Sequence, residues 1–99
     1  MKPSEWFKTH DWLQKAGAYK YDAHRNLIGA CLVGAIRQYR LTLPNFDTHR
    51  DIMDTWMESR DRLHDIIVER YGTRNEMEVN NYHLKDKQEV IHLLQEVGL

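Results

Sequence analysis

The sequence predicts an all-α fold, a compact bundle of about four helices packed around a central apolar helix. Two observations predict it. Apolar residues recur at helical spacing in separate segments, and ten apolar residues, Leu27 to Ile36 with two glycines counted among them, run unbroken inside an otherwise polar chain. The 99 residues are 41% hydrophobic and 29% charged, a composition that suits a folded chain and not a disordered one. We therefore expect a single helical domain, residues 1–99.

The first two helices are expected from about Glu5 to Ala16 and from about Ala23 to Leu41. The second contains the apolar run and is apolar on nearly all sides, as a buried central helix is. Gly34 costs this helix about 1 kcal/mol relative to alanine, which is tolerable where a neighbouring helix or aromatic ring approaches closely. A buried strand is the competing interpretation of "ACLVGAI", but the helical spacing continues through "RQYRL" and favours a helix.

The second half of the chain predicts one long and one short helix. The long helix is expected from about Thr48 to Tyr71, with Gly72 as its C-cap. Residues 76–80 are expected to form a short strand or an irregular segment. A last helix begins at Asp86 with a D-x-x-E start signal and ends at Gly98. The apolar stripe of the long helix comprises Ile52, Trp56, Leu63 and Ile67.

Two stretches, "CLVGAI" and "VNNYHLKDKQEVIHLLQEVG", resemble motifs of an uncharacterised family of small actinobacterial and actinophage proteins. The family shows Cys-x-x-Gly-Ala and, near its end, Asn-Asp followed by Thr and Glu-Val. Asn81 stands where the family has Asp, and Asp86 where it has Thr. The resemblance covers most of residues 12–97, and it implies a phage or prophage setting and a mainly helical fold, with no catalytic activity. The matching positions are Cys31, Gly34, Ala35, Asn80, Glu89 and Val90. From the residues themselves, we expect Asn80 and Asn81 to satisfy buried backbone groups before the last helix.

Charge is distributed unevenly along the chain. Residues 1–50 carry a net charge of +4 and residues 51–99 a net charge of −5, which indicates either a partner surface or helices of opposite charge packed together.

Cys31 has no second cysteine to pair with, and its apolar neighbours predict a buried, inert thiol. The apolar run is shorter than the roughly 20 residues that span a bilayer, and the N-terminal segment lacks a signal-peptide core. We expect a cytoplasmic protein, in the host cytoplasm if phage-encoded, that does not enter a membrane.

The sequence lacks the patterns of the common catalytic and metal sites. None of the six histidines pair as H-x-x-x-H, and one cysteine gives no zinc-ligand spacing. Nucleophilic catalysis would need Cys31 exposed beside a base. The glycines do not form a phosphate-binding loop. We therefore expect no enzyme activity, no metal and no cofactor.

Five side chains are the candidates for protein interaction: Trp12, Arg37, Tyr39, Arg40 and Arg60. Trp12 lies off the stripe of its predicted helix. Arg60 lies inside an apolar stripe, where it either rests its stem on the core, pairs with a buried carboxylate or meets a partner. Aromatic and arginine side chains carry much of the binding energy at interfaces. The sequence thus predicts a non-enzymatic phage or prophage accessory protein that binds a host or phage protein, and a homodimer is consistent with its two charged halves.

Nucleic-acid binding is the alternative function. Basic residues of the first half alternate with tyrosines, a combination that provides phosphate contacts and stacking. Against this alternative, the net charge of the chain is −1 and no helix-turn-helix spacing is present. The residues concerned are Lys15, Lys20, Arg25, Arg37, Arg40, Tyr19, Tyr21 and Tyr39.

Overall fold

The computed structural model describes residues 1–15, 18–44 and 49–99. Within these residues the fold is mixed α/β, so the predicted all-α bundle is wrong: three short strands form a sheet, two of them inside predicted helices and β2 in the predicted connection between those helices. The elements in chain order are α1 Pro3–Trp6, β1 Asp11–Trp12, β2 Tyr19–Tyr21, β3 Leu27–Ala30, α2 Leu32–Thr42, α3 Arg50–Tyr71, α4 Glu76–Glu78, the π-helix η1 Val79–His83, and α5 Lys87–Glu96.

The predicted first helix, residues 5–16, ends early because side chains compete for its backbone. His10 Nδ1 and Thr9 Oγ1 are both hydrogen-bonded to the carbonyl oxygen of Trp6, at 2.8 and 3.3 Å. In a continuing helix that oxygen would accept from the backbone N–H of His10. Bonds of this kind offer the backbone an alternative to helix. The chain beyond α1 is therefore free to become β1.

The sheet has the order β1-β3-β2, with β1 parallel and β2 antiparallel to the central strand β3. Gly29 of β3 pairs with Asp11 on one side and with Lys20 on the other. A Cβ at Gly29 would lie 3.0 Å from the Cβ of Asp11 and 3.3 Å from that of Lys20. Lys20 Nζ and Asp11 Oδ2 form an ion pair at 3.0 Å. The glycine thus leaves room for two charged side chains to meet across the central strand.

The ten-residue apolar run is divided between β3 and α2. The predicted continuous helix over residues 23–41 is therefore wrong in its first half, where residues 27–30 form β3. The competing strand over "ACLVGAI", residues 30–36, is wrong as well, because only Ala30 belongs to β3 and residues 32–36 belong to α2. The break falls at Cys31, whose backbone is extended and whose Sγ accepts a hydrogen bond from the N–H of Gly34 at 3.2 Å. A central strand followed directly by a buried helix requires an unbroken apolar run, just as a single buried helix does.

Gly34 lies where α2 meets the start of β2, so of the two expected neighbours the aromatic ring is found and the helix is not. A Cβ on Gly34 would lie 2.8 Å from the carbonyl oxygen of Ala18 and 3.1 Å from the ring of Tyr19. The same carbonyl accepts a hydrogen bond from the N–H of Cys31 at 3.0 Å. The expected close approach is therefore made by strand backbone and an aromatic ring.

The two helices predicted in the second half are confirmed. α3 ends at Gly72, which adopts a left-handed conformation with φ +72°, where glycine is favoured as a cap. α5 begins at Asp86, whose side chain accepts from the N–H of Glu89 at 2.8 Å, as the D-x-x-E signal predicts. The predicted start of α3 at Thr48 lies outside the described residues.

Helical turns replace the strand or irregular segment expected at residues 76–80. The side chain of Asn75 accepts from the N–H groups of Met77 and Glu78, at 3.0 and 3.2 Å, and so starts α4. The chain continues directly into η1, whose wider turns are uncommon and are frequent at functional sites. The sequence reasoning missed the Asn75 cap, because no apolar periodicity follows it.

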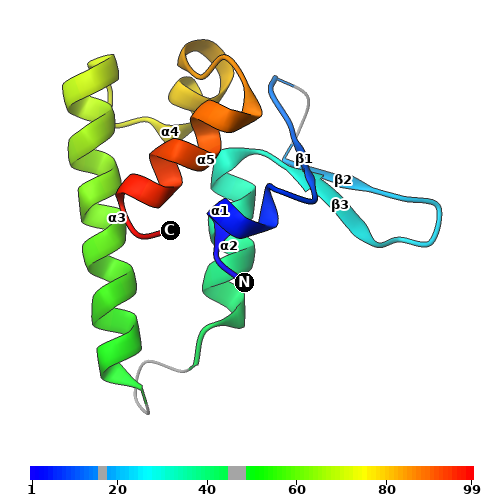
Figure 1. Cartoon of the computed structure of the whole chain (residues 1–99), viewed down its shortest axis with the longest axis horizontal. Helices are drawn as coiled ribbons and strands as arrows, with labels where there is room; N and C mark the ends of the chain where they lie inside the picture. Colours follow the sequence, from blue (N-terminus) through cyan, green and yellow to red (C-terminus); the bar gives the residue numbers. More distant parts are fainter. Residues whose placement is uncertain (16–17, 45–48) are drawn as a thin grey trace.

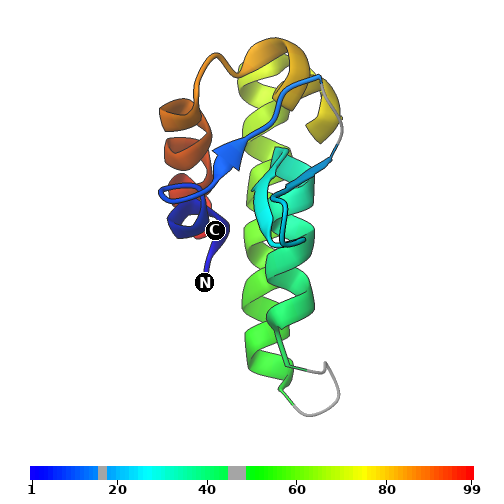
Figure 2. The same ribbon diagram turned by 90° about the vertical axis from the view of Figure 1, so that its right-hand side faces the viewer.

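Figures 1 and 2 show the arrangement of these elements. α2 and α3 run antiparallel, α1 and α5 lie across one side of them, and the β2–β3 hairpin projects from the N-terminal end of α2. The two termini are adjacent, and the N–H of Ser4 donates to the carbonyl of Leu99 at 2.9 Å. Within the described ranges, no helix combines the length and the apolar character that crossing a bilayer requires. The largest buried apolar side chains are Phe7, Leu32, Leu63, Ile67, Leu84, Leu93, Leu94 and Leu99.

Candidate interaction site

An open cavity of about 200 Å³ lies between α2 and α3, and we call it the α2–α3 groove. Three of the five predicted interaction residues line it, although they come from two helices that are far apart in the sequence. The remaining two, Trp12 and Tyr39, lie elsewhere. The residues that line the groove are Val33, Ile36, Arg37, Arg40, Trp56 and Arg60.

Trp56 is the aromatic member of the groove. The guanidinium carbons of Arg40 and Arg60 lie 5.5 and 5.7 Å from the centroid of its ring, within the distance at which a cation is attracted to the face of a ring. Its Nε1 is buried and, in the part of the chain that the structure describes, has no hydrogen-bond partner. The apolar spacing of α3 predicted Trp56 as part of the core stripe and did not indicate this role. The signal that could have found it is the i,i+4 spacing of Trp56 and Arg60.

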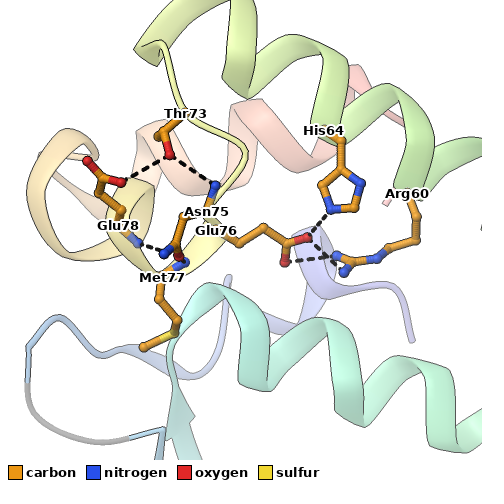
Figure 3. Close-up of polar contacts among 7 residues, drawn as sticks. All are labelled: Arg60, His64, Thr73, Asn75, Glu76, Met77 and Glu78. Atoms are coloured by element: carbon orange, nitrogen blue, oxygen red, sulfur yellow. Dashed lines mark hydrogen bonds and ion pairs between the residues drawn. The ribbon is translucent and has the colours of Figure 1, made fainter.

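Arg60 is held by a buried carboxylate from α4 (Figure 3). Its Nη2 lies 2.7 Å from Oε1 of Glu76 and its Nη1 3.0 Å from Oε2, a bidentate pair. His64 Nε2 lies 2.8 Å from the same Oε1. Only 8% of Glu76 is exposed. Of the three alternatives weighed for Arg60, the pairing with a buried carboxylate is therefore confirmed, and the positive charge of Arg60 is matched within the molecule.

Arg37 and Arg40 differ from Arg60, because within residues 1–15, 18–44 and 49–99 no carboxylate forms an ion pair with either. They lie three residues apart on α2 and therefore on neighbouring turns of one face. Arg37 is exposed and Arg40 is half-buried. The helix that carries them contains no acidic residue. Among the described residues, the groove thus has two positive charges along one wall that no carboxylate matches.

Trp12 has a structural role in the fold, and its part in an interaction stays a prediction. Its Nε1–H donates to Oδ1 of Asn80 at 2.7 Å. Asn80 is completely buried, and its Oδ1 also accepts from the N–H of Leu32 at 2.9 Å. Its Nδ2 donates to the carbonyl of Leu13 at 3.0 Å and to Oδ1 of Asn81 at 2.9 Å. The expectation that Asn80 satisfies buried backbone groups is confirmed, and its side chain joins β1, η1 and the start of α2.

Tyr39 lies on another side of α2 and is not part of the groove. It lines two separate cavities of about 270 and 150 Å³. The larger lies against the C-terminal residues, and Trp56 also lines it. The structure therefore divides the predicted cluster of Arg37, Tyr39 and Arg40 between two faces of one helix.

Asp11 and Tyr71, whose pKa values are shifted, do not line the groove. The hydrogen bond and charge of Lys20 lower the pKa of Asp11, and burial raises the pKa of Tyr71. No three His, Cys, Asp or Glu side chains among the described residues gather as a metal-ion site. Cys31 is 1% exposed and its sulfur is occupied by the N–H of Gly34, so the predicted buried thiol is confirmed.

Comparison of the chain with protein-family models, with curated protein sequences and with solved structures gives no match in any of the three. The resemblance to the actinobacterial and actinophage family therefore stays a prediction based on its motifs. The structure gives three of the motif residues physical roles. Cys31 caps α2, Gly34 packs against strand backbone, and Asn80 binds the first N–H of α2. All three roles concern the structure around the start of α2.

Proposed function

We propose that this protein is a non-enzymatic accessory factor of the phage or prophage type, which acts in the cytoplasm by binding another protein in the α2–α3 groove. The observation that carries the proposal is the position of Arg37 and Arg40. They line one cavity with Trp56 and, among the residues that the structure describes, have no carboxylate partner. Arginine and tryptophan are the residue types that most often dominate binding energy at protein interfaces. The phage setting rests on the sequence motifs alone.

The size and rigidity of the groove support a protein partner. Its volume of about 200 Å³ is below the roughly 300–1,000 Å³ typical of cofactor and small-molecule sites, so it suits one or two side chains of a partner. Glu76, which is also bound to His64, fixes the guanidinium of Arg60 before any partner arrives. A wall that is already ordered reduces the entropy lost on binding.

The distribution of acidic residues favours a protein partner over nucleic acid. α3 carries six exposed carboxylates against four arginines, and none of these carboxylates lines the groove. They would repel an extended polyanion that continues along α3 beyond the groove, whereas a short segment held within the groove does not meet them. The basic residues of the first half are also partly occupied, since Lys20 pairs with Asp11 and Lys15 lies over the ring of Tyr82. The acidic residues are Asp51, Asp54, Glu58, Asp61, Asp65 and Glu69.

Affinity capture with matched charge variants tests this proposal. The wild-type protein, the double variant Arg37→Glu/Arg40→Glu and the control Arg62→Glu/Arg74→Glu are immobilised and exposed to lysate of the host cell. The control makes the same change of charge at exposed positions outside the groove. We expect a protein that binds the wild type and the control, fails to bind the groove variant, and repeats this pattern when purified. A partner retained equally by all three proteins would contradict the proposal.

The groove variant must also keep its fold. Replacing the half-buried Arg40 removes its contact with Trp56, worth about 0.5–2 kcal/mol, and places a negative charge in the last turn of α2. The variant is therefore expected to melt at a lower temperature but to remain folded at the temperature of the binding assay. Circular dichroism melts measure this directly. A variant that unfolds instead would show that the two arginines are structural, and would contradict their assignment to an interface.

A further inference from the structure

We infer that the α2–α3 groove binds an acidic segment of its partner, one in which carboxylates flank an apolar side chain; the inference rests on the function proposed above. Apart from Arg60, which Glu76 already binds, the residues of the groove have counterparts in such a segment. The two unmatched arginines take the carboxylates, and the apolar walls take the side chain between them. The following observations lead to this chemistry.

The arginines determine the charge of the partner. A guanidinium binds a carboxylate through two parallel hydrogen bonds, a geometry that lysine does not offer. Arg37 and Arg40 lie on neighbouring turns of α2, and the guanidinium of Arg40 is held against Trp56. Each of the two guanidiniums can bind one carboxylate of a segment that lies along this face of α2. Arg60 adds no further unmatched charge, since Glu76 already neutralises it.

The walls determine the rest of the segment. Val33, Ile36 and Trp56 are apolar and lie beside the arginines in the same cavity. An aliphatic or aromatic side chain placed there removes apolar surface from water, at about 25 cal/mol per Å². A segment with carboxylates alone would leave these walls hydrated. The groove therefore favours an apolar side chain between acidic residues over a run of acidic residues.

Binding of short synthetic peptides tests the inference. A fluorescent peptide with leucine between glutamates is titrated with the full-length protein, and anisotropy reports binding. We expect saturable binding that weakens as salt rises, that falls at least about tenfold in Arg37→Glu/Arg40→Glu, and that is unchanged in Arg62→Glu/Arg74→Glu. The variant Arg37→Lys/Arg40→Lys keeps both positive charges but loses the paired N–H donors of the guanidinium groups. It is expected to bind with intermediate affinity.

Three comparison ligands complete the test. A peptide with glutamine in place of glutamate is expected not to bind, and a phosphoserine peptide and oligothymidylate are expected to bind more weakly than the glutamate peptide. Equal binding of the glutamine peptide would overturn the role of the carboxylates. Tighter binding of either phosphate ligand would overturn the choice of carboxylate.

Measurement of the oligomeric state tests the remaining occupant of the groove, a second copy of this chain. A second copy of this chain offers exposed Met57 among the carboxylates of α3, so sedimentation velocity is measured over a wide range of protein concentration. A dimer that Arg37→Glu/Arg40→Glu dissociates would make the second copy the occupant and overturn the inference of a separate partner. Failure of the glutamate peptide, together with a natural partner that still depends on Arg37 and Arg40, would overturn this inference and leave the proposed function standing.

Discussion

Replacement of Asn80 by alanine should remove the contact that joins the sheet to the helices. The substitution deletes four side-chain hydrogen bonds at a completely buried position. It leaves the indole N–H of Trp12, the backbone N–H of Leu32 and the carbonyl of Leu13 without their partner. A buried polar group left unsatisfied costs about 1–3 kcal/mol, and water entering the vacated space would reduce the penalty. We therefore expect a loss of roughly 3 kcal/mol.

Urea unfolding followed by circular dichroism measures this loss of free energy. A decrease of roughly 3 kcal/mol corresponds to a fall in melting temperature of about 12–24 °C for a domain of this size. Asn75→Ala is the matched control, because Asn75 caps α4 from an exposed position and a lost cap costs about 1 kcal/mol. If Asn80→Ala destabilises the protein no more than Asn75→Ala does, Asn80 is not the junction that the hydrogen bonds indicate.

Further predictions concern the fold around this junction. Gly34→Ala should destabilise the protein by roughly 1–3 kcal/mol, despite the better helix propensity of alanine, because its Cβ would lie 2.8 Å from the carbonyl oxygen of Ala18; unchanged stability in a thermal melt would contradict the contact. The thiol of Cys31, 1% exposed, should react with a thiol reagent only as fast as the protein unfolds, and rapid labelling of the native protein would show that it is accessible. The backbone N–H of Asn26 lowers the pKa of Asp22, so the carboxylate stabilises the hairpin above its unfolded pKa of about 3.9 and loses this effect as the pH falls through the lower folded value. An NMR titration of Asp22 with a midpoint at or above 3.9 would refute that stabilisation.

The sequence predicted those elements whose signals are local. The Gly72 cap and the D-x-x-E start at Asp86 each fix a helix end through residues within one turn, and both are found in the structure. The buried thiol of Cys31 likewise followed from its immediate neighbours. These predictions needed no knowledge of what packs against the segment.

The failures of prediction concern contacts that are distant in sequence. Whether residues 27–30 form strand or helix depends on pairing with β1 and β2, because an apolar run suits both a central strand and a buried helix. The assignment of Trp12 depended on Asn80, which lies 68 residues away. The groove is formed by α2 and α3 together. The arginines Arg37, Arg40 and Arg60 could be recognised in the sequence as interaction candidates, but their common cavity and the role of Trp56 could not, because they depend on how the two helices pack.

The most direct test of the central claim is the NMR signal of the Trp56 indole N–H during titration with the acidic peptide. The chain has three tryptophans, and the Trp56→Phe variant identifies the signal of Trp56 by its loss. Trp12 provides an internal control, because its indole N–H is already bound to Asn80 and lies outside the groove. The account predicts a saturable shift of the Trp56 signal with the signals of Trp6 and Trp12 unchanged, and loss of that shift in Arg37→Glu/Arg40→Glu. A peptide that binds while the Trp56 signal stays in place would contradict the assignment of the α2–α3 groove as the binding site.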